Sequence, residues 1–451
     1  EEIRKRAELQ KEIANPDWRI NFLALGERNC KKIDSAAVAE AMQKVSLMEV
    51  PGWFGSPISL VLGWLAIIGI IGSVVLSICS VISINIPLWW VMLQYMVVFF
   101  ICKQTLDKID SNGGKLRHQL IAYSQILRLI AQRNFQSQLG REIQESLSDA
   151  LPSFAQLEKI LKGYDRRGNF LGLFFTDAFM LSDFFLVRSF LKWKNTYMVK
   201  MEEWMNVISE MDAMVSMADF RYNHPEANEP ELQELPEIIF EGKNLYHPFL
   251  GAKAVKNDFT VKDGNYYIIT GANMAGKSTF LRSLGVNYIL AMAGMPVFAD
   301  HLKISRFRIF SSMRTTDDLT HGISYFNAEL IRLEELLKFC KGSASGERSE
   351  RLKTLIILDE ILKGTNSLDK LNGSRKFLEA ISQLPVSGII ATHDLELSKM
   401  ENDPSGKFHN FCFEIDLGTD VTYTYKIQRG VARNQNATFL LNKILEKNFG
   451  E

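Results

Sequence analysis

The sequence has few cysteines and no net charge, and both features bear on the kinds of site and partner that can be expected. Its 451 residues include 5 cysteines that lie far apart, which argues against a disulfide framework or a zinc site and fits a reducing compartment. Basic and acidic residues number 52 each; a strongly basic chain would have implied a nucleic-acid partner, whereas this neutral chain implies nothing about one. The length allows two or three domains. The cysteines are Cys30, Cys79, Cys102, Cys340 and Cys412.

Charged residues are missing completely from residues 51–102. About 20 apolar residues span a bilayer, so this run is long enough for two spans, which we predict at 58–82 and 87–102. Tryptophans near the ends of both segments suit the membrane interface. The alternative is a buried helical pair in a large soluble protein, although such helices are usually shorter and carry an occasional charge.

The residues around this hairpin predict its orientation. The loop between the spans is too short for a domain, so both flanks lie on one side of the membrane. Basic residues on both flanks place that side in the cytoplasm, as in a multi-pass protein of a bacterial inner membrane. They are Lys31, Lys32 and Lys44 before the hairpin, and Lys103, Lys108, Lys115 and Arg117 after it.

A third apolar stretch, residues 169–190, contains Asp177, Asp183 and Arg188. Because each of these charges would be costly at mid-span in lipid, we expect a core or interface helix there. The chain begins with Glu1 inside a charged helical pattern, so we interpret it as part of a longer protein.

The remaining sequence shows two kinds of pattern. Residues 1–50 and 103–222 are charged and amphipathic with few helix breakers, which predicts an all-α core or lever domain. Residues 223–237 are polar and contain prolines, as in a linker. Residues 238–451 alternate short apolar strands with helices, which predicts an α/β domain with a mostly parallel sheet. The strand candidates are 266–270, 306–313, 354–360, 387–393, 411–417 and 421–427.

The segment TGANMAGKSTF, residues 270–280, fills the G-x-x-x-x-G-K-[ST] pattern of a phosphate-binding loop. Its glycines let backbone N–H groups point at phosphate oxygens, and the helix starting near Ser278 adds its positive N-terminal end. Lys277 would lie along the β- and γ-phosphates of ATP, and the Ser278 hydroxyl would bind Mg²⁺. A chance glycine turn is the alternative, which the strand–loop–helix context disfavours. The expected nucleotide-binding residues are Gly271, Ala272, Asn273, Met274, Ala275, Gly276, Lys277, Ser278 and Thr279.

Two later strand candidates end in polar residues that suit ATP hydrolysis. Asp359 would hold Mg²⁺ through water, and Glu360 would orient or deprotonate the attacking water. His393 follows another apolar strand and would contact the γ-phosphate. The alternatives are a pair of surface acids and a structural histidine.

These segments resemble the ATPase domain of the MutS mismatch-repair proteins in order and approximate spacing. Residues 6–26 and 208–218 also resemble the start and the end of the lever region in that family. The segments that carry the ATPase resemblance are YHP (246–248), GANMAGKST (271–279), DDLTHGISYFNAEL (317–330), LDEILKGTNSLD (358–369) and ATHDLEL (391–397).

The resemblance implies an ABC-type P-loop ATPase that forms a homodimer, in which each site is completed by a serine of the other subunit. Here that serine would be Ser324, with Phe326 and Glu329 beside it, and it would stabilise charge on the γ-phosphate. Asn366 and Asp369 would lie in the loop that crosses the dimer interface. Ser324 also fits an ordinary helix cap, and the two roles are compatible.

The sequence departs from the family pattern in several places. Lys363 stands where the family has arginine, and Ala254 stands where an aromatic residue stacks on the base. The mismatch-reading domain with its phenylalanine wedge does not occur in these 451 residues. A predicted membrane hairpin instead interrupts the lever region.

We therefore expect a membrane-tethered, dimeric, Mg²⁺-dependent ATPase whose nucleotide cycle moves long helical levers. DNA is a candidate partner by resemblance, although no basic stripe with interleaved aromatic residues supports it. The first alternative is a nucleotide-gated membrane scaffold that recruits partners. The second is an ABC transporter ATPase, disfavoured because two spans are few and no LSGGQ signature occurs.

Overall fold

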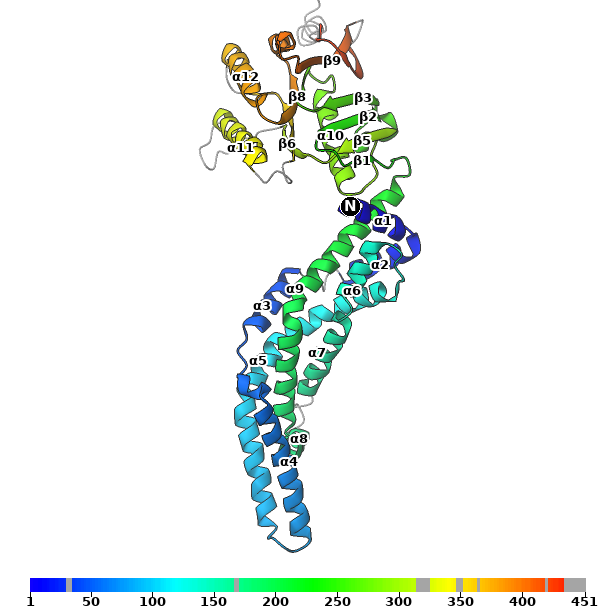
Figure 1. Cartoon of the computed structure of the whole chain (residues 1–451). Coiled ribbons are helices and arrows are strands. Elements are labelled where there is room, and N and C mark those ends of the chain that lie inside the picture. The colour runs from blue at the N-terminus through cyan, green and yellow to red at the C-terminus, as the bar shows by residue number, and fades with distance from the viewer. Residues whose placement is uncertain are drawn as a thin grey trace, which may run out of the picture. The chain divides into compact units, whose positions relative to one another are not determined.

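The structure is a computed structural model that describes residues 1–29, 35–165, 170–313, 325–345, 352–362, 366–417 and 421–433 (Figure 1). The chain divides into two compact units. We call residues 8–220 the helical unit, and residues 1–7 together with 221–451 the α/β unit.

The described part of the helical unit consists of helices and the turns between them. Its core holds two fully buried tryptophans, Trp193 and Trp204. The indole N–H of Trp193 donates to the carbonyl oxygen of Ser153 at 3.0 Å, which ties two helices together. The helices are α1 (Glu2–Ile13), α2 (Pro16–Asn29), α3 (Ser35–Leu47), α4 (Pro57–Ile78), α5 (Asn85–Gln132), α6 (Gln138–Ser146), α7 (Ala150–Asp165), α8 (Phe170–Met180) and α9 (Ser182–Asn223), with the 3₁₀ helix η1 (Gly52–Gly55) before α4.

Two helices, α4 and the first part of α5, are long and apolar enough to cross a membrane. They coincide with the two predicted spans, although α4 ends at Ile78 and α5 continues without a break to Gln132. The helices approach closely at Gly69, where a Cβ would lie 2.8 Å from the indole ring of Trp90. Glycine at this position therefore allows the two helices to pack together.

The apolar side chains of this hairpin lie mostly on the surface of the unit. Within the chain, only 22% of the residues in the most apolar window of each helix are buried. Among the described residues of this chain, the two helices are therefore not packed as a buried core pair. Its exposed side chains include Ile58, Val61, Leu62, Leu65, Ile68 and Ile71 on α4, and Leu88, Trp89, Leu93 and Phe100 on α5.

The third apolar stretch differs from the single helix expected there. It breaks at Leu181, whose φ is 47°, into α8 and α9. Asp177 stabilises this break because its Oδ1 accepts hydrogen bonds from the Ser182 hydroxyl (2.7 Å) and the Asp183 N–H (2.8 Å). These bonds cap the start of α9.

Six strands form the main sheet of the α/β unit, and all six coincide with the strands predicted from the sequence. They lie in the order β10-β9-β4-β8-β7-β6, and every neighbouring pair is parallel except β9 with β10. The expectation of a mostly parallel sheet is confirmed. The strands are β4 (Tyr266–Gly271), β6 (Arg308–Ser312), β7 (Thr354–Asp359), β8 (Val386–Thr392), β9 (Phe408–Leu417) and β10 (Val421–Arg429).

Side chains along each buried strand alternate between the two faces of this sheet. Tyr266 and Ile268 of β4 belong to one core with residues of α11 (Tyr325–Ser345) and α12 (Ser367–Ile381). Tyr267 and Ile269 belong to the other core, with residues of α10 (Lys277–Met292). Figure 1 shows α11 and α12 together on one side of the main sheet. The sheet is thus covered on both faces, as its apolar strands require.

A second, four-stranded sheet completes the α/β unit and was not expected from the sequence. Its order is β1-β5-β2-β3, and Phe240, Phe259 and Leu302 from this sheet join the core on the α10 side. The segment predicted as a linker carries β1, which pairs with β5. The strands are β1 (Glu231–Gln233), β2 (Ile239–Leu245), β3 (Asn257–Lys262) and β5 (His301–Ser305), and the short helices are η3 (Pro248–Lys253) and η5 (Leu395–Asn402).

Candidate functional site

The parallel strands bring three of the predicted catalytic residues, Lys277, Glu360 and His393, to one edge of the main sheet. β4, β8 and β7 are neighbours, with Thr270 opposite Thr392 and Asp359 opposite Ala391. The segments that follow these strands therefore meet at the carboxyl edge, where ligands bind in open α/β sheets. A cleft of about 740 Å³ lies there, within the usual size of small-molecule sites.

The phosphate-loop segment curls between β4 and α10. Gly271 is needed because a Cβ there would lie 2.9 Å from the carbonyl oxygen of Phe413, and Gly276 has a φ of 107°. The side chain of Lys277 is buried, and its ammonium donates to the carbonyl oxygens of Gly271 (2.7 Å) and Ala272 (2.9 Å). α10 begins at this lysine, so the first N–H groups of the helix lie at the same loop. An ammonium group beside a helix N-terminus suits a phosphate group.

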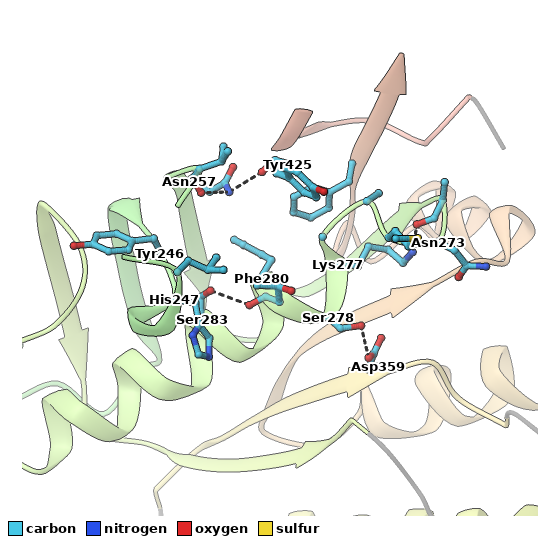
Figure 2. A pocket seen from close by; sticks show the side chains of 18 of the residues that line it. Tyr246, His247, Asn257, Asn273, Lys277, Ser278, Phe280, Ser283, Asp359 and Tyr425 are labelled. Atoms are coloured by element: carbon cyan, nitrogen blue, oxygen red, sulfur yellow. Dashed lines mark hydrogen bonds between the residues drawn. The ribbon is translucent and has the colours of Figure 1, made fainter. Parts of the chain in front are cut away.

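Ser278 and Asp359, the predicted Mg²⁺ ligands, are in direct contact. Ser278 Oγ donates a hydrogen bond to Asp359 Oδ2 at 2.6 Å (Figure 2). A hydroxyl and a carboxylate are the hard oxygen donors that Mg²⁺ takes beside phosphate oxygens and water. The two side chains therefore fit this ion, and their role as ligands stays a prediction.

Glu360 directly follows β7, and its neighbours include Ala391, His393 and Lys370. Its φ of 64° lies in the left-handed region, which is strained for a residue with a side chain. Its N–H donates to the carbonyl oxygen of Ala391 at 2.8 Å. Its carboxylate lies 3.2 Å from His393 Nε2 and 3.8 Å from Lys370 Nζ. This backbone conformation thus places the carboxylate in the wall of the cleft.

Lys370 is a residue that the sequence reasoning misses. It stands in the first turn of α12, where the positive end of the helix dipole disfavours a cation. A lysine at this unfavourable position was the available signal, because it indicates a carboxylate partner elsewhere in the fold. That partner is Glu360.

His393 lies between Lys277 and Glu360. Lys277 Nζ is 3.4 Å from each nitrogen of the imidazole ring. Burial, followed by the charge of Lys277, lowers the pKa of His393 below its ordinary value of 6.5, whereas Glu360 acts in the opposite direction. The ring is therefore neutral near neutral pH. It can donate one hydrogen bond and accept another at the cleft without adding charge.

This lowered pKa predicts a pH dependence of stability. The unfolded chain binds a proton at His393 more readily than the folded chain does. The contribution of neutral His393 to the free energy of unfolding is therefore present above pH 6.5 and is lost as the pH falls below that value. His393→Asn is expected to reduce the fall in unfolding temperature between about pH 7.5 and pH 5.5, measured by thermal denaturation. An unchanged fall would contradict the assignment. His247 and His409 have pKa values lowered by burial and act in the same direction, so part of the fall remains.

An aromatic ring reaches the cleft from β10, which the sequence reasoning also misses. The register between β9 and β10 shifts between Tyr423 and Ile427, and Tyr425 in this bulge has a φ of 52°. Asn257 stabilises the bulge, because its Nδ2 donates to the Tyr425 carbonyl oxygen at 3.0 Å (Figure 2). Its Oδ1 also accepts the Ile427 N–H at 2.9 Å. Other apolar residues that line the cleft are Leu245, Leu250, Val255, Met274, Phe280 and Phe413.

The residues expected at a dimer interface are only partly described. Glu329 is buried on α11. Asn366 caps α12, because its Oδ1 accepts the Asp369 N–H at 2.9 Å, and both residues are exposed. A role of these two residues across a dimer interface stays a prediction. Ser324, Lys363 and the side chain of Phe326 lie outside the described residues.

Comparisons with known proteins agree with this geometry. The MutS domain V family model matches residues 267–440. The DNA mismatch repair protein MutS of Acetivibrio thermocellus is 32% identical over 241 residues, which are 50% of this chain and 26% of the relative. The protein of the same name from Lachnoclostridium phytofermentans is 32% identical over 239 residues, 50% of this chain and 24% of the relative. The protein of the same name from Clostridium botulinum strain Loch Maree is 29% identical over 244 residues, which are 52% of this chain and 25% of the relative.

The chain spans about a quarter of the length of these curated relatives. The matched residues include the phosphate loop, Asp359, Glu360 and His393, which the fold brings to one cleft. Residues 267–440 therefore belong to the MutS domain V family, and about half of the chain is similar to these MutS proteins.

Proposed function

We propose that this chain is a Mg²⁺-dependent ATPase of the MutS type, anchored in a membrane by α4 and the first part of α5. Two copies close on ATP, and hydrolysis separates them and shifts the helical unit. The observation that carries the proposal is the single cleft that joins Lys277, the Ser278–Asp359 pair and the Glu360–His393 pair.

The groups of this chain divide the work of hydrolysis in this proposal. The loop N–H groups and Lys277 bind the β- and γ-phosphates. Ser278 and Asp359 hold Mg²⁺, which neutralises phosphate charge. Glu360 orients a water molecule and accepts its proton, and neutral His393 donates a hydrogen bond toward the γ-phosphate. The backbone at Glu360 fixes its carboxylate in advance, so little rearrangement is needed when ATP binds.

Exposed apolar side chains in and beside the cleft support closure of two copies. Met274 in the phosphate loop is 75% exposed, and Phe249 in η3 is 92% exposed. Leu368, in the first turn of α12, is 67% exposed. Burying such side chains against a second copy is favourable by ~25 cal/mol per Å² of apolar area. In the closed pair, Ser324 of one copy completes the site of the other.

The exposed hairpin supports the membrane anchor. The outward apolar surfaces of α4 and α5 are unfavourable in water and favourable among lipid acyl chains. Lys103 follows the apolar run on α5 and lies over the ring of Phe99, 5.3 Å from its centroid, as a lysine near a membrane interface does. Basic residues in the sequence on both sides of the hairpin support a cytoplasmic location for both units.

Tyr425 is proposed to stack on the adenine base, since it brings a ring to the cleft beside the phosphate loop. Tyr425→Ala is expected to weaken ATP binding roughly 5- to 150-fold, because base–aromatic stacking contributes ~1–3 kcal/mol. A fluorescent-nucleotide titration measures this change. Tyr425→Phe keeps the ring and should bind normally. Unchanged affinity in the Tyr425→Ala variant, or an equal loss in the Tyr425→Phe variant, would argue against stacking.

ATP turnover by the purified full chain in lipid nanodiscs tests the proposed function. We expect turnover that requires Mg²⁺ and stops when EDTA removes the ion. The relatives are named DNA mismatch repair proteins, and stimulation by duplex DNA at low salt would extend that role to this chain. Tight nucleotide binding without turnover would instead favour a nucleotide-gated scaffold.

A further inference from the structure

The turn between α8 and α9 lies directly against the apolar hairpin of the helical unit. The Gln94 side chain on α5 donates from its Nε2 to the carbonyl oxygen of Ala178 on α8 at 2.9 Å. Ala178 is fully buried and packs in one cluster with Ile70 of α4 and Val91 of α5. Partly buried side chains around this cluster are Tyr95, Phe174 and Phe179. Figure 1 shows α8 beside α4 within this unit.

The depth of this contact follows from the helix positions. Ile70 is 13 residues from the start of α4 at Pro57, which is roughly 20 Å at about 1.5 Å per residue. Gln94 is 9 residues from the start of α5 at Asn85, which is roughly 14 Å from the opposite end of the hairpin. Both estimates place Ala178 near the middle of the two apolar helices.

Arg188 marks the level at which α9 leaves the hairpin. Its Nη1 donates to the carbonyl oxygens of Phe54 (2.7 Å) and Ser56 (2.8 Å), which immediately precede α4. The residues between Ala178 and Arg188 therefore lie alongside the apolar part of the hairpin, and the positive charge of Arg188 lies where that part begins.

The two acids of this segment face the protein interior. Asp177 and Asp183 are 0% and 1% exposed. Asp177 caps α9 through its bonds to the Ser182 hydroxyl and the Asp183 N–H. The outer surface instead carries Phe175 and Met180, which are 58% and 66% exposed. Acidic side chains in membrane segments face the protein interior, and both of these acids do so, so they do not exclude the segment from lipid.

We propose that residues 174–187 form a re-entrant helical pair that enters the bilayer beside the hairpin and returns on the same side. Phe175 and Met180 contact lipid acyl chains. The partner follows from continuity, because these side chains extend the exposed apolar surface of α4 and α5. The proposal rests on the proposed membrane anchor. The re-entrant pair adds a second lipid-facing segment to the hairpin. The charged residues in this stretch had led us to expect a core or interface helix there.

Photo-crosslinking in native membranes tests this inference with the full chain. Benzoyl-phenylalanine replaces Phe175, and in separate variants it replaces Ile68 of α4 or Val199 of α9; all three positions are exposed, at 58%, 62% and 86%. Mass spectrometry then measures the fraction of each variant joined to lipid. We expect the Phe175 variant to give lipid adducts within about threefold of the Ile68 variant and at least about tenfold above the Val199 variant, because acyl chains fill only the hydrocarbon layer.

The outcomes separate this inference from the membrane anchor itself. Lipid adducts at Ile68 with none at Phe175 would overturn the re-entrant pair and leave the anchor standing. Absence of lipid adducts at Ile68 would overturn both. Equal adducts at Val199 and Phe175 would also contradict the proposed depth. Retained ATP turnover in the Phe175 variant shows that the substitution at this exposed position leaves the fold intact.

Discussion

Glu360→Gln is expected to lower ATP turnover by about 10²–10⁴-fold, the usual contribution of a general base. Glutamine preserves the size of the side chain and its hydrogen bonding to His393 but accepts no proton from water. The nucleotide affinity should stay close to that of the native chain, because the phosphate loop and Lys277 are unchanged. Single-turnover hydrolysis and a nucleotide titration on the same preparation measure the two effects separately.

Glu379→Gln is the matched control for this substitution. Glu379 is an exposed acid on α12 that pairs with Arg375, away from the phosphate loop in sequence and outside the group held by His393. It should hydrolyse ATP at the native rate. Native turnover in the Glu360→Gln variant would show that Glu360 is not the general base. The strained backbone at position 360 would then have no role in catalysis.

The second large effect concerns the hairpin. Leu65 and Ile68 lie on the outer face of α4, 58% and 62% exposed. Replacing both with lysine is expected to remove most of the chain from carbonate-washed membranes. Each lysine near the middle of a span costs about 2.5–3.5 kcal/mol on insertion, so the pair costs roughly 5–7 kcal/mol. The protein fraction that stays in the washed membrane pellet measures the effect.

Val199→Lys is the control for the hairpin variant, because Val199 is exposed on α9 outside the apolar helices. It should leave the membrane fraction unchanged. The membrane anchor would be wrong if carbonate washed the native chain itself off the membranes. In that case the double lysine variant would become more soluble and keep full ATP turnover. That result would mean that the apolar face of α4 meets water or a protein partner.

Three strands of the main sheet, β4, β7 and β8, were predictable because they are buried on both faces. YYIIT in β4 and TLIIL in β7 are continuous apolar runs, the pattern that a covered parallel sheet imposes. The strands of the smaller sheet lack that signal. β2 contains Glu241, Gly242 and Lys243, and β1 is only three residues long. β3 alternates buried and exposed residues, but over six positions this alternation is too short to stand out.

The part of the site that depends on tertiary structure was not predictable. The phosphate loop, Asp359, Glu360 and His393 follow strands in the chain, so a local pattern marks each of them. Tyr425 reaches the cleft only because a bulge held by Asn257, far away in the sequence, turns its side chain. The break at Leu181 likewise depends on a side-chain cap and has no glycine or proline at the turn.

Closure of two copies of this chain on ATP and Mg²⁺ is tested most directly by the particle mass of the Glu360→Gln chain in nanodiscs or detergent, measured with and without saturating ATP and Mg²⁺. We expect two copies per particle with nucleotide, and a shift toward one copy when ATP and Mg²⁺ are withdrawn. A single copy at saturating nucleotide would contradict it.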